Sequence, residues 1–371
     1  MKIGIDAKSF FWGPISTRKI LQNLIPELLK LYPDVHWFIF LDKKDKGLEF
    51  PAKSLNLHIQ YVWAENNQVS NLFVLPYYIK KHKLDLVIYQ MFPSIITSTP
   101  AIAFIHDVLF RDFPKFFTWK ERLYFFPISF LTRRASRLIA TTEFVATDLV
   151  KYNYVDSRSL IDIVPLGVST EFKPADHFDT KLLESVTKRF QLPDRFLLFV
   201  GRINVRKNLE NLLKAIPLIQ DKRIPLVVVG NAEWKVPELK NLSSDLNIQD
   251  RVIMIGNISD QDLPPVYALS TIFCFPSFAE GFGLPPLEAM ASGVPVVVSN
   301  TTSLPEVCGE AATYVDPHQP SSIAAAIDRL LSNSSLGNQK KTEGVRRAAQ
   351  FTWEKTAERF MNSIKKVLLP S

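Results

Sequence analysis

Cysteine is scarce in this sequence, since only Cys274 and Cys308 occur among its 371 residues. One lies in a strongly apolar segment and the other near a predicted loop, so we expect two buried thiols and no disulfide framework. The six histidines are scattered without the spacing of metal ligands, and we expect no bound metal. The sequence therefore argues against disulfide-stapled domains and zinc modules.

Long apolar runs are missing as well. No stretch approaches the ~18 consecutive apolar residues that a membrane-spanning helix needs. The amino terminus (MKIGIDA) has the pattern of a strand rather than of a signal peptide, so we expect a cytoplasmic protein. Apolar residues make up 47% of the chain, and its length predicts about two domains, each large enough to bury its own core.

Strand patterns alternate with helical patterns along almost the whole chain, which predicts parallel α/β layers. The polar stretch from Pro174 to about Pro193 is the best candidate for a linker between two such halves. In the second half, five strands separated by helical segments indicate a doubly wound sheet (residues 195–201, 225–231, 251–257, 271–277 and 294–300).

The most informative motif is EGFGLPPLE at residues 280–288, which places a carboxylate at each end of a glycine-bearing turn from a strand into a helix. Gly281 and Gly283 allow a ligand to approach the backbone, and the amides at the helix start favour an anion such as a diphosphate. Glu280 is then suited to sugar hydroxyls and Glu288 to the two hydroxyls of a ribose. By spacing alone, an ordinary turn with two solvated glutamates explains the motif equally well.

A second motif lies at residues 196–216, where an apolar strand ends at Gly201 and a basic loop leads into a helix. The loop contains Arg202 and Lys207, and two cations in such a loop can neutralise two phosphate groups and a leaving group together. The alternative is a basic surface loop.

Both segments resemble glycosyltransferase family 4. Residues 275–317 are similar to the family's donor site in the glutamate pair, in the Gly-Val-Pro-Val turn into the next strand and in the Leu-Pro-Glu-Val segment after it. Residues 196–216 are similar to the strand, loop and helix that hold the donor diphosphate in this family, and they precede the glutamate motif in the family's order.

The resemblance implies the GT-B fold, with two Rossmann-like doubly wound domains facing across a cleft and a C-terminal helix that crosses back to the first domain. The acceptor-side domain is then residues 1–175 with helix 355–371, and the donor-binding domain is residues 176–354. Retention of configuration, a nucleotide-sugar donor and independence of metals and cofactors are also implied. The residues implied in donor binding are Arg202, Lys207, Glu280, Gly281, Phe282, Gly283, Leu284, Glu288, Gly13 and Gly230, and those implied in catalysis are His106, Glu280, Arg202 and Lys207.

His106 follows an apolar strand in the first half and resembles the family's active-site histidine. Its ordinary pKa near 6.5 allows either charge state, and it can hydrogen-bond a sugar hydroxyl or polarise the acceptor. A purely structural histidine is the alternative.

The loop at residues 10–20 departs from the family, which has a glycine-rich turn here. Only Gly13 remains, followed by Pro-Ile-Ser-Thr, so fewer backbone amides can reach a phosphate. Ser16 or Thr17 is predicted to cap the following helix instead.

The first half is the basic one, with 22 Lys and Arg against 16 Asp and Glu in residues 1–175. Within it, residues 115–137 interleave aromatic and basic side chains, a pattern that suits peripheral contact with an anionic membrane. The alternative is that the aromatic rings pack in the core while Arg133, Arg134 and Arg137 remain solvated. The sequence has no recognised nucleic-acid-binding motif, so we expect no such partner.

Taken with the resemblance, these features predict a retaining transferase that moves a hexose from a nucleotide diphosphate sugar to a hydroxyl of a glycan or lipid-linked saccharide. Mannose from GDP-mannose is favoured, because the segments RKNLENLL and TTSLPEV resemble bacterial mannosyl- and related polysaccharide transferases. The alternatives are a UDP-glucose, other UDP-sugar or dTDP-sugar donor, a phosphorylase or sugar-nucleotide epimerase of the same fold, and a binding protein that has lost turnover.

Overall fold

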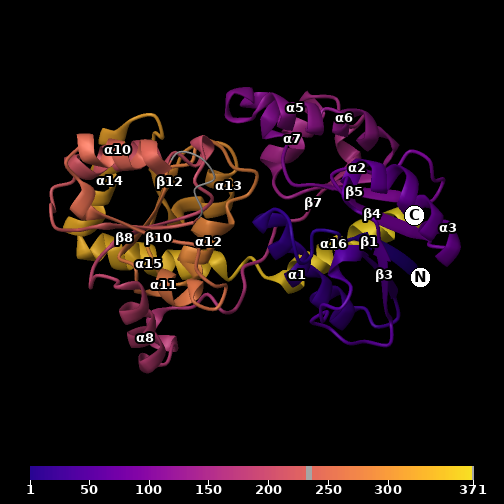
Figure 1. Cartoon of the computed structure of the whole chain (residues 1–371), viewed down its shortest axis with the longest axis horizontal. Coiled ribbons are helices and arrows are strands. Elements are labelled where there is room, and N and C mark those ends of the chain that lie inside the picture. Colours follow the sequence, from indigo (N-terminus) through magenta and orange to yellow (C-terminus); the bar gives the residue numbers. More distant parts are fainter. Residues whose placement is uncertain (231–235, 370–371) are drawn as a thin grey trace. The chain divides into compact units, whose positions relative to one another are not determined.

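The computed structural model describes residues 1–230 and 236–369. The chain forms two compact units: Met1–Gly167 together with Thr352–Ser371 make the first, and Val168–Phe351 make the second (Figure 1). Each unit is built around its own parallel sheet covered by helices, as predicted for a doubly wound α/β protein.

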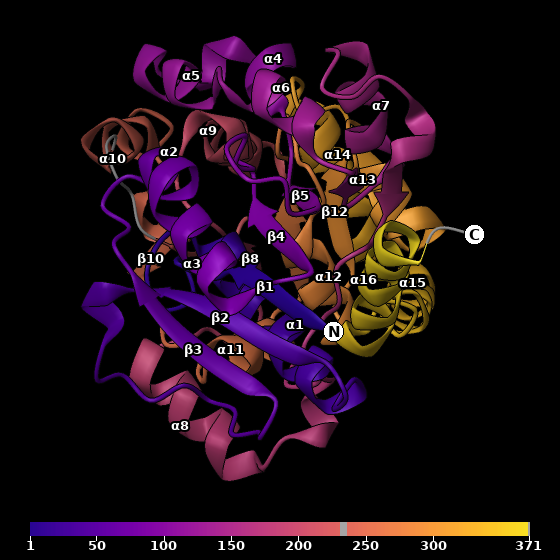
Figure 2. The same ribbon diagram turned by 90° about the vertical axis from the view of Figure 1, so that its right-hand side faces the viewer.

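The first unit contains a seven-stranded sheet in the order β3-β2-β1-β4-β5-β6-β7, part of which faces the viewer in Figure 2. Its strands are β1 (Lys2–Asp6), β2 (His36–Asp42), β3 (Leu57–Val62), β4 (Leu86–Gln90), β5 (Ala101–Ile105), β6 (Arg137–Ala140) and β7 (Ile161–Ile163). Its helices are α1 (Ile15–Leu31), α2 (Asn67–Val69), α3 (Leu75–His82), α4 (Leu109–Asp112), α5 (Trp119–Phe125), α6 (Ile128–Leu131), α7 (Glu143–Lys151) and α16 (Trp353–Leu368).

The C-terminal helix α16 packs against α1 and β6 of the first unit, which confirms the predicted return of the chain. The ring of Phe360 lies 5.7 Å from that of Phe104 on β5, and the hydroxyl of Thr356 donates to the carbonyl of Pro165 at 2.8 Å. The start of α16 packs so closely against Gly167 that no side chain fits there: a Cβ would lie 2.3 Å from the backbone nitrogen of Trp353.

The second unit contains a six-stranded parallel sheet in the order β10-β9-β8-β11-β12-β13. Its strands are β8 (Leu197–Val200), β9 (Leu226–Val229), β10 (Val252–Gly256), β11 (Ile272–Phe275), β12 (Val296–Ser299) and β13 (Thr313–Val315). Its helices are α8 (Thr180–Phe190), α9 (Leu209–Ala215), α10 (Val236–Asp245), α11 (Leu263–Leu269), α12 (Leu284–Ala291), α13 (Leu304–Cys308), α14 (Pro320–Ser332) and α15 (Ser334–Ala348).

Three local predictions are wrong. The predicted linker contains helix α8, which packs against α11 through a narrow apolar face centred on the buried Val186. Ser16 and Thr17 do not cap α1, because the helix already begins at Ile15 after Pro14 and has no side-chain cap. Arg137 is not a solvated cation, since its guanidinium binds the carboxylate of Asp162 at 2.7 and 2.9 Å.

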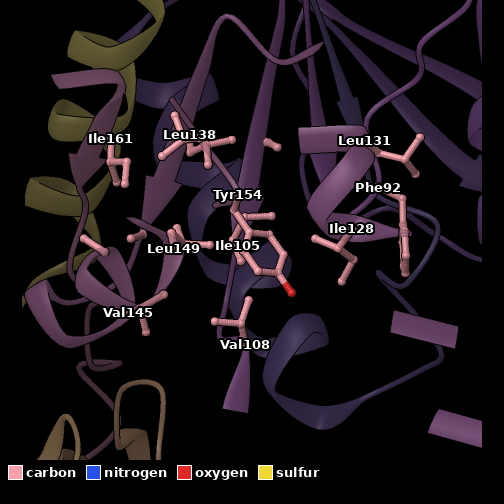
Figure 3. Close-up of a cluster of buried hydrophobic side chains, with 14 of the residues drawn as sticks. Phe92, Ile105, Val108, Ile128, Leu131, Leu138, Val145, Leu149, Tyr154 and Ile161 are labelled. Carbon is pink, nitrogen blue, oxygen red and sulfur yellow. The ribbon is translucent and has the colours of Figure 1, made fainter. Parts of the chain in front are cut away.

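The segment 115–137 has some side chains packed in the core and others exposed to solvent. Ile128 and Leu131 lie in the core cluster of Figure 3, and Phe117 and Phe125 pack against that cluster. A second set of side chains on the same segment is exposed: Trp119, Leu123, Phe126 and Phe130 each expose 62–64% of their surface. The core therefore accounts for only part of the aromatic content.

Candidate functional site

The two sequence motifs meet at the carboxyl edge of the sheet in the second unit. The basic loop follows β8 and the glutamate loop follows β11, and these strands are parallel neighbours with Leu198 opposite Phe273. The strand order reverses here, because β9 and β10 extend the sheet on one side of β8 whereas β11 to β13 extend it on the other. Such a switch point is where doubly wound sheets bind their ligands.

Glu280 is held by three side chains. Lys207 Nζ lies 2.7 Å from Oε1, and Arg206 Nη1 lies 3.0 Å from Oε2. The hydroxyl of Ser277 also donates to Oε1, at 2.5 Å. Burial alone would raise the pKa of Glu280, but the charges of Arg206 and Lys207 outweigh it and lower the pKa to about 2. The carboxylate is therefore ionised throughout the neutral range.

The loop that carries Glu280 is also fixed through its backbone. The hydroxyl of Ser303 donates to the carbonyls of Glu280 and Phe282 at 2.8 and 2.9 Å, and the amide of Glu280 donates to the hydroxyl of Thr302 at 3.0 Å. The backbone φ of +114° at Gly283 favours glycine, and a Cβ there would lie 2.7 Å from the side chain of Leu304. These contacts set where α12 begins.

Glu288 lies on α12 and exposes only 4% of its surface. Its Oε2 accepts a hydrogen bond of 3.0 Å from the hydroxyl of the buried Tyr267. Burial, together with the nearby Glu288 carboxylate, raises the pKa of Tyr267, so the phenol stays a donor. Glu280 exposes only 6%, and the alternative of two solvated glutamates is therefore wrong.

The remaining predicted residues of the second unit lie around the same edge. Arg202 is exposed directly after Gly201, at the start of the basic loop. The ammonium of Lys207 lies 4.7 Å from the centre of the Phe275 ring, in addition to its contact with Glu280. Gly230 follows β9 with a φ of +139°, and a Cβ there would lie 2.0 Å from the carbonyl oxygen of Gly201. This close approach gives Gly230 a structural reason to be glycine.

His106 and Gly13 belong to the first unit. His106 follows β5, and its Nε2 lies 3.0 Å from Oε1 of Gln90 at the end of the neighbouring strand β4. Because an amide oxygen only accepts, the proton lies on Nε2, and Nδ1 is buried without a partner among the described residues. Gly13 precedes α1 with a φ of +121°.

Burial lowers the pKa of His106 from 6.5 to about 4. The expectation that this histidine can take either charge state near neutral pH is therefore wrong, and the imidazole is neutral there. The sequence could not show this, because the shift depends on the fold of the first unit, in which His106 is half-buried and its Nδ1 is screened from solvent.

Sequence reasoning missed Arg206, Thr302, Ser303 and Tyr267. Arg206 stood beside Lys207 in the basic loop, and the adjacent charges were a visible signal. The other three carry hydroxyl groups that reach the glutamates only through tertiary packing, at separations of 21 to 23 residues.

The two parallel sheets, the return of α16 to the first unit and the site at the switch point define a GT-B glycosyltransferase. Residues 184–350 match the family described as glycosyl transferases group 1, and residues 19–172 match glycosyltransferase family 4. The chain is 32% identical over 272 residues to the O-antigen chain mannosyltransferase B of Escherichia coli, covering 71% of this chain and 70% of that relative. It belongs to glycosyltransferase family 4 and is a retaining glycosyltransferase.

Other similarities agree with this assignment. The MMP alpha-(1->4)-mannosyltransferase of Mycolicibacterium hassiacum is 31% identical over 61% of this chain and 53% of its own length. The sucrose-phosphate synthase of Thermosynechococcus elongatus has the same fold, with a TM-score of 0.79 at 19% identity over 100% of both chains. Anabaena HepE, solved with UDP and glucose, reaches 0.75 at 17% identity over 99% of this chain and 100% of its own.

Proposed function

We propose that this enzyme transfers mannose from GDP-mannose to a hydroxyl of a glycan or lipid-linked saccharide. The observation that carries the proposal is the buried, ionised Glu280, held beside Lys207 in the loop before α12. Two relatives at about 30% identity are named as mannosyltransferases, which supports the choice of sugar and with it the choice of base.

In the proposed donor complex, the diphosphate lies against Arg202, Lys207 and the amide of Leu284 at the helix start. Lys207 has three N–H donors and can therefore contact a phosphate oxygen as well as Glu280. Glu280 accepts hydrogen bonds from the sugar hydroxyls, and Glu288 accepts them from the ribose. We also propose His106, in the first unit, for a hydrogen bond to a hydroxyl of the transferred sugar.

The proposed reaction is a front-face displacement. The bond from the anomeric carbon to the diphosphate oxygen breaks while the acceptor oxygen bonds to that carbon on the same face. The acceptor proton passes to the departing diphosphate, whose growing charge is stabilised by Arg202, Lys207 and the helix dipole. Electrostatic stabilisation of the leaving group accounts for most of the catalysis in this scheme.

A thermal-unfolding screen tests the choice of donor. GDP-mannose at 100 times its dissociation constant should stabilise the protein by about 2.7 kcal/mol, whereas UDP-glucose and dTDP-glucose at the same concentration should do so less. A larger shift with a UDP- or dTDP-sugar would overturn the GDP-mannose assignment. No shift with any nucleotide sugar would contradict the donor site as a whole.

We further propose that the enzyme works at the cytoplasmic face of an anionic membrane. Trp119, Leu123 and Phe126 are exposed on and directly after α5, and Lys120 and Arg122 are exposed beside them. Such a face can insert its rings at the headgroup level while its cations meet anionic lipid. Within residues 1–230 and 236–369, no helix has both the length and the apolar character to cross a bilayer.

Vesicle binding tests this contact. The protein should bind vesicles that contain phosphatidylserine, and binding should weaken as salt screens the charges. Exchanging Lys120, Arg133 and Arg134 for Gln should weaken it further, whereas the same exchange at Lys181, Lys188 and Arg223, which are exposed in the second unit, should not. A wild type that ignores anionic vesicles at low salt would contradict the proposal.

A further inference from the structure

Arg206 connects the basic loop to the glutamate loop at several points. Its side-chain Nη1 donates to the carbonyl of Ala279 at 2.6 Å and to Oε2 of Glu280 at 3.0 Å. Its own carbonyl accepts the amide of Phe278 at 2.9 Å and the hydroxyl of Ser277 at 3.0 Å. Arg206 thus contacts every residue from 277 to 280 and holds the glutamate loop against the basic loop.

The two oxygens of Glu280 have different partners. Oε1 is bound by Lys207 and Ser277, whereas Oε2 is bound by Arg206. A lysine ammonium on a flexible stem can turn toward a new anion, but the planar guanidinium of Arg206 is fixed by its second bond to the carbonyl of Ala279. The arrangement provides one mobile cation and one fixed cation for a single carboxylate.

We propose that Arg206 is a positioning residue, which holds the Glu280 carboxylate in place when Lys207 turns toward the diphosphate of the donor. The inference rests on the proposed function, because the diphosphate is what draws Lys207 away. A buried carboxylate that loses its only cation becomes costly to keep charged and free to rotate. With Arg206 present, Glu280 keeps Oε2 paired and directs its remaining acceptor capacity at the sugar hydroxyls.

The proposal has an electrostatic signature. Among the described residues, the charged groups found to act on Glu280 are Arg206 and Lys207, while the hydroxyl of Ser277 and the hydroxyl of Thr302 are its neutral neighbours. Burial raises the pKa of this carboxyl and the two cations lower it. Removing Arg206 therefore raises the pKa of Glu280, and Glu280 then takes up a proton at a higher pH. The fall in rate at acid pH should therefore begin at a higher pH than in the wild type.

The experiment compares wild type with Arg206→Gln, Arg206→Lys and the control Lys214→Gln. Lys214 pairs with Glu210 on the exposed face of α9, outside the site. Binding of GDP-mannose to the wild type is measured first, so that failure of the proposed function is recognised separately. The value of kcat, the KM for donor and the affinity for free GDP are then measured from pH 4 to pH 8.

Arg206→Gln should lower kcat at pH 7 by about tenfold or more while the GDP affinity stays within about twofold, because the lost contact acts on the sugar end. Between pH 4 and pH 8 the wild type should show no acid limb from Glu280, whose pKa is about 2, whereas Arg206→Gln should bring one into this range and Arg206→Lys should remove most of it again. No such acid limb in Arg206→Gln, or a loss of GDP affinity as large as that of Lys207→Ala, would overturn the proposal. The second result would make Arg206 a phosphate ligand instead.

If Arg206→Gln folds poorly, a double-mutant cycle with Arg206→Lys and Glu280→Gln tests the proposal instead. With Glu280 already replaced by Gln, the charge of Arg206 has no carboxylate to position, so adding Arg206→Lys should change kcat by less than about twofold. In the wild-type background, the same Arg206→Lys change should cost a measurable part of kcat, because the shorter lysine side chain does not bring its ammonium to the place where Nη1 bonds both Ala279 and Glu280. Equal effects in the two backgrounds would contradict the inference.

Discussion

Replacing Lys207 by alanine is expected to lower turnover by about a hundredfold or more, since losing one charged donor to a developing anion typically costs several kcal/mol. The ammonium of Lys207 lies at the carboxyl edge of β8 and β11, 2.7 Å from Glu280, and Lys207 precedes Asn208, the N-cap residue of α9. Steady-state rates with the preferred nucleotide sugar measure the effect. Arg202→Ala should show a loss of similar size, because both cations face the leaving group in the proposed complex.

The control for this prediction is Lys214→Ala, which removes an exposed lysine of α9 and should leave the rate unchanged. Part of the loss in Lys207→Ala comes from Glu280, which keeps Arg206 as its cation but loses Lys207. The affinity for free GDP separates the effect on the phosphate from the effect on Glu280, because it should fall only if Lys207 binds the diphosphate directly. If Lys207→Ala or Arg202→Ala retains a near-normal rate with an unchanged Tm, the diphosphate assignment is wrong.

Glu280→Gln and Glu288→Gln are expected to give opposite phenotypes. The proposed contact of Glu288 with the ribose would be made equally in the ground state and the transition state, so its loss should weaken the binding of free GDP with a smaller effect on kcat. In the proposed complex Glu280 contacts the transferred sugar, whose charge changes during the reaction, so its loss should mainly lower kcat. Calorimetric titration with GDP and steady-state kinetics measure the two effects.

Tyr267→Phe serves as the matched variant for Glu288. It keeps the buried ring and removes only the hydroxyl that donates to Glu288 at 3.0 Å. We expect it to weaken GDP binding in the same direction as Glu288→Gln but to a smaller extent. Reversed phenotypes for Glu280 and Glu288 would show that the sugar and ribose ends of the motif have been exchanged.

The strands of the second unit could be predicted because a parallel sheet covered on both faces produces short, continuous apolar runs. Strand β9 (Leu226–Val229) and β12 (Val296–Ser299) are such runs and are buried throughout. Strand β13 has only three residues, of which Val315 alone is buried, and left no recognisable pattern. Helix α8 was predicted as a linker because most of its residues are polar, and in the structure it buries only Val186.

The site was predictable where its residues are contiguous in sequence. Glu280, the glycines and Glu288 share one motif, and Lys207 lies in another, so both could be compared with a known family. The pairing of Arg206 with Glu280 joins residues that are 74 apart and arises only because β8 and β11 are adjacent in the sheet. The neutral state of His106 likewise required the fold, since it follows from burial of the ring against Phe104, whose centroid is 4.7 Å away.

For the basic aromatic segment at residues 115–137, the sequence could not decide between an exposed membrane-facing surface and aromatic rings packed in the core. Helix α6 buries Ile128 and Leu131, whereas α5 buries no residue fully and only packs Phe125 against the core, so core and exposed side chains are mixed within one short stretch of sequence. Ile128 and Leu131 are buried in the cluster of Figure 3, whereas Phe130 between them exposes 62% of its surface. Sequence periodicity is weak over helices of only four to seven residues.

The most direct test of the account is the release of GDP from GDP-mannose in the absence of acceptor. A working glycosyltransferase with this donor site should release nucleoside diphosphate slowly as water takes the place of the acceptor. Lys207→Ala should abolish that release, and Lys214→Ala should not. A wild type that binds GDP-mannose yet releases no GDP, with UDP- and dTDP-sugars equally inert and no transfer to any saccharide, would contradict the account. The chain would then be a sugar-nucleotide-binding protein rather than an enzyme.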